Sequence, residues 1–321
     1  MTKSTDKGLG SVVALCCGIG LITVVGTLAF GRAGLLPEHG AKQNSHITEE
    51  YGKRILADTT EVLGPDVADP KMRYTFSRLA CGSCHIGAGE EPGNLSLATA
   101  ITRYPRKSPR VGGPESIELR INGCMMRSMN GKPLPENSQE MAALVKYLTF
   151  LNEQDAAEGA SRKKAHESPA FKYPARKADF ANGEKVFGER CAACHGRDGE
   201  GLAASKNPVD GFVFPPLWGL NSFNDGAGMH RVLTAAKFIK AKMPLGKADL
   251  NDDDAFDVSA YINSRPRPEM AGLEKDYPNR REKPIDTGYG PYADDFPLEQ
   301  HRFGPFPPIQ AYYDKLPKAA K

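Results

Sequence analysis

The sequence lacks a marked excess of charge of either sign. Its 42 lysine and arginine residues are nearly balanced by 39 aspartate and glutamate residues, so the formal net charge is only +3 over 321 residues. It also lacks a stretch in which basic and aromatic residues alternate. Proteins that bind nucleic acid need a basic surface to meet the phosphate backbone, so this class of function is excluded.

Histidine and cysteine are scarce, at seven residues each, yet two of the histidines and four of the cysteines fall in two C-x-x-C-H sequences at 81–85 and 191–195. The other histidines are scattered, so neither cysteine pair has the further ligands that a zinc or thiol-redox site would need. A C-x-x-C-H sequence attaches a c-type haem through two thioether bonds and supplies its proximal histidine. The sequence therefore predicts two covalently bound haem c groups, with attachment residues Cys81, Cys84, Cys191 and Cys194 and proximal iron ligands His85 and His195.

A long apolar run lies near the N-terminus, where residues 11–30 carry no charge and follow Lys3 and Lys7. This pattern predicts an export signal with a cytoplasmic N-terminus. The length of the run and the lack of an A-x-A-like cleavage site favour an uncleaved membrane anchor over a cleaved signal peptide, although both stay open. We expect the rest of the chain in the periplasm, since c-type haem is attached outside the cytoplasm.

The chain is long enough for two domains, and the haem motifs divide it between them. Each half has a helix-like segment before its motif, then a glycine- and proline-rich loop, a candidate distal ligand and a closing helix. The sequence therefore predicts a mainly α protein with two cytochrome c-type domains, each around one haem. The expected divisions are a signal or anchor segment at 1–34, an N-terminal domain at 35–151, a linker at 152–179, a C-terminal domain at 180–264 and a proline-rich, irregular tail at 265–321.

Apolar periodicity and capping residues locate the helices. We expect helices at 49–63 and 183–190 before the two motifs, and closing helices at 136–151 and 251–263. Asn251 is the expected N-cap of the last helix, because acidic residues follow it in the first turn. In each half the haem itself would supply much of the core.

The second half contains a Met-Pro pair, Met243-Pro244, of the kind that precedes the last helix of a small cytochrome c. Met243 is therefore the expected distal ligand of the second haem. A thioether ligand favours the reduced state and raises the reduction potential, which makes this haem the expected exit for electrons. Lys242 is adjacent, and a neutral amine can also bind haem iron, so it stays open as an alternate ligand.

Cys124 occupies the corresponding position in the first half, between the haem motif and the closing helix. A soft sulfur ligand at this haem would suit sulfur chemistry better than simple electron relay. Met125 and Met126 compete for the position, because methionine is the commoner distal ligand. The residues alone leave these alternatives open.

Three arginines lie near Cys124 in the sequence, and a serine adds a further hydrogen-bond donor. Guanidinium groups form paired, charge-assisted hydrogen bonds to oxyanions, so the cluster predicts a site for a sulfur oxyanion beside a thiolate. The same arginines could instead neutralise haem propionates, which explains one or two of them more readily than all three. The residues in question are Arg110, Arg120, Arg127 and Ser128.

Residues 120–134, with the sequence RINGCMMRSMNGKPL, closely resemble the segment that carries the cysteine ligand in the dihaem thiosulfate dehydrogenases. Residues 103–106 and 135–137 fit that segment as well, and so does the Lys242-Met243 pair. The resemblance covers about residues 49–263. It is specific, because it includes both haem motifs and both distal-ligand regions.

The resemblance implies two packed cytochrome c domains that oxidise two thiosulfates to tetrathionate. Two electrons would pass through the haems to an acceptor cytochrome or similar carrier. The site residues that it implies are the catalytic ligand pair His85 and Cys124, the transfer pair His195 and Met243 with Lys242 as a redox-dependent substitute, and a thiosulfate site lined by Arg110, Arg120 and Ser128.

Two other functions stay open. The dihaem subunit of the Sox complex also uses cysteine-ligated haem and passes thiosulfate to a carrier protein, but the Met-Pro pair of the second half argues against it. A membrane-tethered dihaem electron carrier would need no substrate pocket and would leave Cys124 as a packing residue. The direction of the reaction, thiosulfate oxidation or tetrathionate reduction, depends on haem potentials that the sequence does not set.

Overall fold

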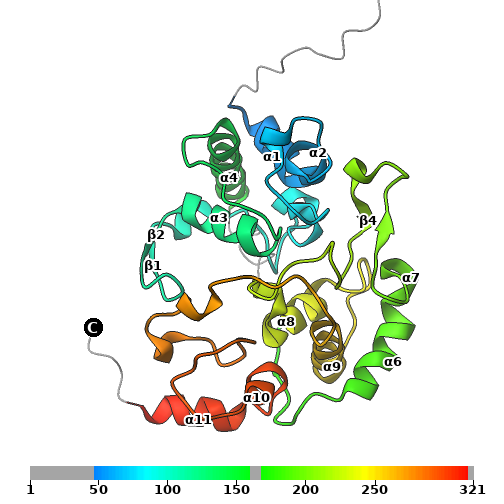
Figure 1. The fold of residues 1–321 in the computed structure, drawn as a ribbon, viewed down its shortest axis with the longest axis vertical. Coiled ribbons are helices and arrows are strands. Elements are labelled where there is room, and N and C mark those ends of the chain that lie inside the picture. Colours follow the sequence, from blue (N-terminus) through cyan, green and yellow to red (C-terminus); the bar gives the residue numbers. More distant parts are fainter. Residues whose placement is uncertain (1–46, 160–167, 317–321) are drawn as a thin grey trace, which may run out of the picture. The chain divides into compact units, whose positions relative to one another are not determined.

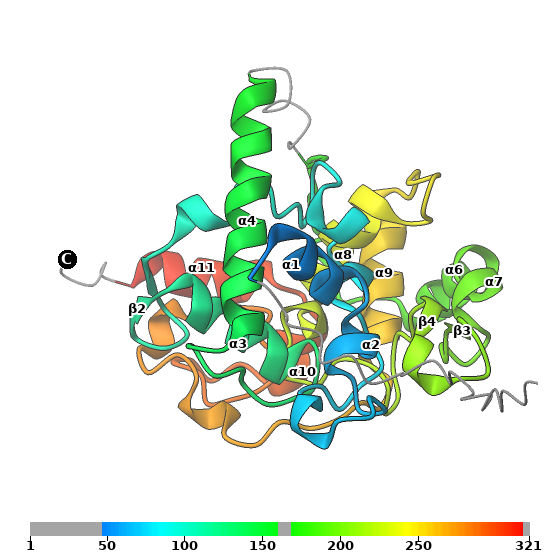
Figure 2. The same ribbon diagram turned by 90° about the horizontal axis from the view of Figure 1, so that it is seen from above.

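A computed structural model describes residues 47–159 and 168–316, which belong to one compact unit spanning residues 45–321. This unit is mainly helical and also contains short antiparallel hairpins (Figures 1 and 2). The predicted signal or anchor segment at 1–34 lies outside the described residues. Among the residues that are described, no helix is long and apolar enough to cross a membrane.

The first half is built on two crossing helices, α1 and α4, whose buried side chains form part of its core. Thr48 caps α1, because its hydroxyl accepts from the backbone amide of Tyr51 at 3.1 Å. The elements of this half are α1 (Glu49–Ala57), α2 (Thr59–Leu63), the hairpin of β1 (Arg106–Ser108) and β2 (Gly113–Glu115), α3 (Ile117–Arg127) and α4 (Gln139–Glu158).

In the second half, α9 packs against both α6 and α8. Asn251 caps α9 as predicted, since its side-chain oxygen accepts from the amide of Asp254 at 2.7 Å. The elements of this half are α6 (Phe180–Arg190), α7 (Ala192–His195), the hairpin of β3 (Leu202–Ala203) and β4 (Phe212–Phe214), α8 (Val232–Lys242) and α9 (Asp252–Asn263).

A glycine lies at the helix crossing in each half. A Cβ atom on Gly52 of α1 would lie 2.1 Å from the carbonyl oxygen of Ala143 on α4. A Cβ atom on Gly183 of α6 would lie 2.3 Å from the carbonyl oxygen of Asp257 on α9. The repeat seen in the sequence therefore extends to the way in which the helices cross.

Alanine in place of Gly183 should lower the free energy of unfolding by about 1–3 kcal/mol, because the methyl group meets backbone that must shift. The same substitution at Gly188, on the same helix, meets no atom within 4 Å. It should instead raise the free energy of unfolding by about 0.5–1 kcal/mol, because alanine forms helix better than glycine. Thermal melting of the two haem-loaded variants measures both effects, and equal shifts would contradict the close crossing.

The sequence predicted the helices but misplaced several of their ends. The segment at 49–63 is two helices, because Asp58 leaves helical geometry with φ −116° and ψ 44°. The helix α4 continues to Glu158, so the first residues of the predicted linker at 152–179 are helical. The helix before the second motif begins at Phe180, earlier than predicted.

The tail was predicted to be irregular, and this is wrong in part, because it contains α10 (Leu298–Phe303) and α11 (Pro307–Lys315). The side chains of Phe306 and Ile309 are fully buried in a cluster with residues of α8 and α9. Burial of aromatic and branched side chains stabilises such short helices. Their apolar positions are too few to show a helical period in the sequence.

His230, at the start of the segment that leads into α8, gives a prediction for the pH dependence of stability. Burial, together with the charge of Arg267, lowers the pKa of His230 to about 4. Between that pH and the ordinary histidine pKa of about 6.5, the unfolded chain binds a proton that the folded chain does not, so stability should fall as the pH falls through this window. This effect should lower the free energy of unfolding by about 3 kcal/mol when the pH has fallen to about 4.

The variant His230→Gln should remove this contribution. Melting temperatures of the variant should therefore depend less steeply on pH between about 4 and 6.5 than those of the wild type. Parallel pH profiles of the two proteins would contradict a buried, neutral His230.

Candidate functional site

The histidines of the two haem motifs are held in the same way, although the motifs differ in backbone structure. Residues Cys81–Ser83 form a 3-10 turn, and the ring Nδ1 of His85 lies 2.7 Å from the carbonyl oxygen of Leu95. His195 ends α7, and its Nδ1 lies 2.7 Å from the carbonyl oxygen of Pro215. A histidine that donates from Nδ1 to a carbonyl keeps the lone pair of Nε2 for a metal. Both rings are therefore oriented as proximal haem ligands would be.

Met243 follows α8 directly and packs against a buried core cluster of the second half that includes Val186, Phe187 and Ile239. Cys191, a predicted attachment residue of the second haem, packs against the same cluster. The helix ends at Lys242, because Met243, which precedes Pro244, has an extended conformation with φ −120° and ψ 144°.

The Lys242 side chain contacts the first half of the chain. Its ammonium group donates to the carbonyl oxygen of Pro92 and lies 3.6 Å from the carboxylate of Glu91. Both partners lie in the loop that follows the first haem motif. Lys242 must leave these partners if it is to bind iron.

Cys124 lies on α3, a helix that the sequence analysis did not predict. Ser116 starts this helix, because its hydroxyl accepts from the amide of Leu119 at 3.2 Å. Cys124 lines the same cavity as His85, whereas Met125 is only 2% exposed in the core of the first half and Met126 lines a different cavity. Of these three sulfur-bearing side chains, that of Cys124 shares a cavity with the haem motif.

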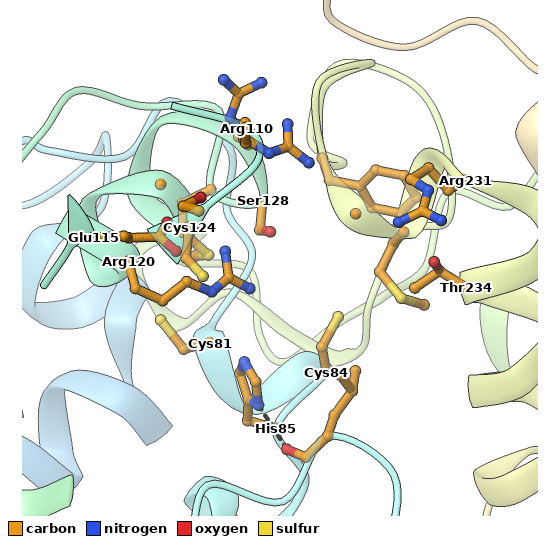
Figure 3. A pocket seen from close by; sticks show the side chains of 18 of the residues that line it. Cys81, Cys84, His85, Arg110, Glu115, Arg120, Cys124, Ser128, Arg231 and Thr234 are labelled. Atoms are coloured by element: carbon orange, nitrogen blue, oxygen red, sulfur yellow. Dashed lines mark hydrogen bonds between the residues drawn. The ribbon is translucent and has the colours of Figure 1, made fainter. Parts of the chain in front are cut away.

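The cavity beside Cys124 has a volume of about 380 Å³. Figure 3 shows the Arg120 side chain reaching into it between Cys124 and His85, with Arg231 and Thr234 on the opposite side. Its walls come from three parts of the chain, because Tyr277, Glu282 and Pro284 of the tail line it as well. All the predicted site residues of the first half line this cavity, namely Cys81, Cys84, His85, Arg110, Arg120, Cys124, Arg127 and Ser128.

The thiols in the cavity differ in how readily they ionise. Burial opposes ionisation of Cys124, but the nearby positive charge, chiefly that of Arg120, outweighs it and lowers the pKa of the thiol to about 7. Burial raises the pKa of Cys81 to about 11 and that of Cys84 to about 12. Cys124 is therefore the thiol of this site that most readily becomes a nucleophilic thiolate.

The arginines of the cavity differ in their partners. Arg106 pairs with Glu115 at 3.2 Å, and Arg231 pairs with Asp286 at 2.9 Å. Arg110 and Arg127 share the carboxylate of Asp276. Within the described part of the chain, Arg120 has no carboxylate within 4.0 Å, so its charge is the least neutralised. The sequence analysis missed Arg106 and Arg231, because nothing in the sequence indicates that they line the same cavity as Cys124.

Comparisons with known proteins fit this architecture. Residues 75–154 match the family model described as SoxA/TsdA, cytochrome c domain. Residues 178–262 match the model described as cytochrome C oxidase, cbb3-type, subunit III. The chain therefore contains two cytochrome c domains.

The chain is 39% identical over 247 residues to the thiosulfate dehydrogenase of Allochromatium vinosum, covering 75% of this chain and 84% of the relative. This chain belongs to the dihaem thiosulfate dehydrogenase family. It is also 42% identical to the thiosulfate dehydrogenase of Psychrobacter arcticus, over 63% of this chain and 61% of that relative. The solved structure of thiosulfate dehydrogenase (TsdBA) from Marichromatium purpuratum, in its as-isolated form, is 32% identical with a TM-score of 0.60. That similarity covers 70% of this chain and 47% of the other. The chain thus spans less than two thirds of the Psychrobacter and Marichromatium proteins.

Membership of this family implies c-type haem, and the residues present fit it. In the first domain, the two cysteines of the C-x-x-C-H sequence, an oriented histidine and the sulfur of Cys124 line one cavity. In the second, a cysteine of the C-x-x-C-H sequence and Met243 pack against the same apolar core cluster. Each domain therefore offers a histidine and a sulfur to an iron atom.

Proposed function

We propose that this chain oxidises two thiosulfates to one tetrathionate and passes the two electrons to an acceptor cytochrome or similar carrier. The observation that carries the proposal is the surroundings of Cys124. A thiol whose pKa is lowered to about 7 lies in a cavity that it shares with His85 and with several arginines. The arginine-lined cavity supports an enzyme over a simple electron carrier.

Two covalently bound haem c groups complete the proposal. His85 and Cys124 would hold the catalytic iron, while His195 and Met243 would hold the iron of the transfer haem, with Lys242 as a redox-dependent substitute. When bound, these groups accept the electrons of the reaction one at a time. Their attachment would use Cys81, Cys84, Cys191 and Cys194.

The protein's own residues would bring two anions together. Two thiosulfate dianions repel each other, so joining their outer sulfur atoms requires a cationic pocket. Arg110, Arg120 and Arg127 line the cavity, and Ser128 adds a hydroxyl donor. Guanidinium groups suit this task because they bind oxyanions through paired, charge-assisted hydrogen bonds.

Cys124 would act as the nucleophile. Its thiolate sulfur forms a bond with the outer sulfur of the first thiosulfate, and two electrons leave to the acceptors. The outer sulfur of the second thiosulfate then attacks the outer sulfur of the first thiosulfate, which is bonded to Cys124. The bond to Cys124 breaks, tetrathionate departs and the thiolate returns. The reverse sequence would reduce tetrathionate.

We further propose that the protein works in the periplasm. The apolar run at 11–30 and the need to attach haem outside the cytoplasm support this location. The protein would be tethered to the inner membrane if the run is retained, and soluble in the periplasm if it is cleaved.

The test is thiosulfate-dependent reduction of ferricyanide by the haem-loaded protein, with tetrathionate quantified. We expect one tetrathionate for every two ferricyanides reduced. Turnover only in the presence of a carrier protein with a reactive cysteine would indicate a Sox-type reaction instead. Absence of turnover with both haems in place would leave an electron carrier.

A further inference from the structure

A buried carboxylate of the C-terminal segment lies beside the cavity. Asp276 is only 8% exposed and accepts three hydrogen bonds. The donors are Nη1 of Arg110 at 2.9 Å, Nη2 of Arg127 at 2.8 Å and the hydroxyl of Tyr289 at 2.7 Å. The two matched cytochrome c domains end at residue 262, so Asp276 lies outside both.

The two arginines come from different elements and meet at a second acceptor as well. Both donate from Nη1 to the carbonyl oxygen of Gly226, each at 3.3 Å. A Cβ atom on Gly226 would lie 2.7 Å from Nη1 of Arg127, so the lack of a side chain admits this approach. Arg110 is also held through its backbone, because its carbonyl accepts from the amide of Tyr277 at 2.8 Å.

Asp276 is what allows two positive groups to lie side by side. Two guanidinium groups that share the same carbonyl repel each other, and a carboxylate between them offsets this repulsion. Within the described residues, every hydrogen bond of the Arg110 side chain leaves from Nη1. Its Nε and Nη2 therefore keep their N–H groups for an anion in the cavity.

We propose that Asp276 is a positioning residue for thiosulfate oxidation. Its carboxylate fixes Arg110 and Arg127 at the cavity wall, so that the anions they bind are held in one geometry relative to Cys124. The C-terminal segment thereby completes a site whose other parts come from the two cytochrome domains. This inference rests on the proposed function.

The test is the variant Asp276→Asn, which keeps the shape of the side chain and removes its charge. We expect kcat for tetrathionate formation to fall by about tenfold, because the arginines lose their common anchor. KM for thiosulfate should not rise, because the substitution removes a negative charge beside an anion site. Calorimetric titration of thiosulfate into the Cys124→Ala background, with and without Asp276→Asn, measures binding apart from turnover.

Two further variants separate positioning from folding. Asp294→Asn alters another buried carboxylate of the same segment, one that accepts from His301 and Tyr313 and does not line the cavity. It should lower the melting temperature and leave kcat of the folded protein unchanged. Tyr289→Phe removes one donor from Asp276 and keeps the charge, so its effect on kcat should be smaller than that of Asp276→Asn.

Each other outcome has a distinct meaning. A kcat for Asp276→Asn within twofold of the wild type overturns the positioning role, and so does a rise in KM at unchanged kcat. Equal losses of kcat, haem content and melting temperature in Asp276→Asn and Asp294→Asn would show a purely structural role. A wild-type protein with both haems that forms no tetrathionate refutes the proposed function itself, and the positioning role with it.

Discussion

Alanine in place of Cys124 is expected to abolish tetrathionate formation, with kcat lowered by at least about 10³-fold. Cys124 is the thiol of the cavity with a lowered pKa, and the neighbouring Cys81 and Cys84 would be bound to haem as thioethers. The other haem-binding residues are untouched, so both haems should remain attached. The ferricyanide and tetrathionate assay measures the loss, and the absorption spectrum of the haems reports their content.

Two matched variants define what Cys124 contributes. Cys124→Met keeps a sulfur atom for the iron but offers no thiolate, so it should retain a six-coordinate haem and lose activity. Met126→Ala alters a neighbouring sulfur that lines a different cavity, and it should stay active. Tetrathionate formation by Cys124→Met would show that the residue acts only as an iron ligand. Tetrathionate formation by Cys124→Ala would refute both the ligand role and the nucleophile role.

The local features of the site could be predicted from the sequence. The haem motifs, the Met-Pro pair and the candidate Cys124 are short patterns whose chemistry depends on neighbouring residues. The predicted cap at Asn251 was confirmed, because a side chain that accepts from an amide three residues later is a local interaction. The residues by themselves could not choose among Cys124, Met125 and Met126. That choice depends on which face of α3 meets the haem motif, and α3 itself was not predicted.

The long-range features of the site could not be predicted. Arg231 and Tyr277 line the cavity although they are distant from Cys124 in the chain. Asp276 forms ion pairs with Arg110 and Arg127, which are similarly far from it in the sequence, and it lies in a tail that was expected to be irregular. Such contacts arise from tertiary packing, in which a proline-rich segment is ordered by burying Phe306 and by salt bridges that no local pattern encodes.

Arg120→Ala is expected to lower kcat/KM for thiosulfate by about 10²-fold. Among the described arginines that line the cavity, Arg120 is the one without a carboxylate within 4.0 Å, and its charge helps to lower the pKa of Cys124. Arg120→Lys keeps the charge and loses the planar fork, so it should recover only part of the activity. Steady-state kinetics of the three proteins measure both effects.

The matched control is Arg103→Ala, which removes an exposed arginine that does not line the cavity and should leave kcat/KM unchanged. Arg120 could also serve a haem propionate, and the two roles differ in what they change. Loss of a propionate partner would alter haem retention or reduction potential and leave KM for thiosulfate unaffected. Loss of a substrate partner would raise KM or lower kcat with the haem spectrum and potential unchanged. Because the Arg120 charge lies beside Cys124 rather than in an ion pair, we expect the second result.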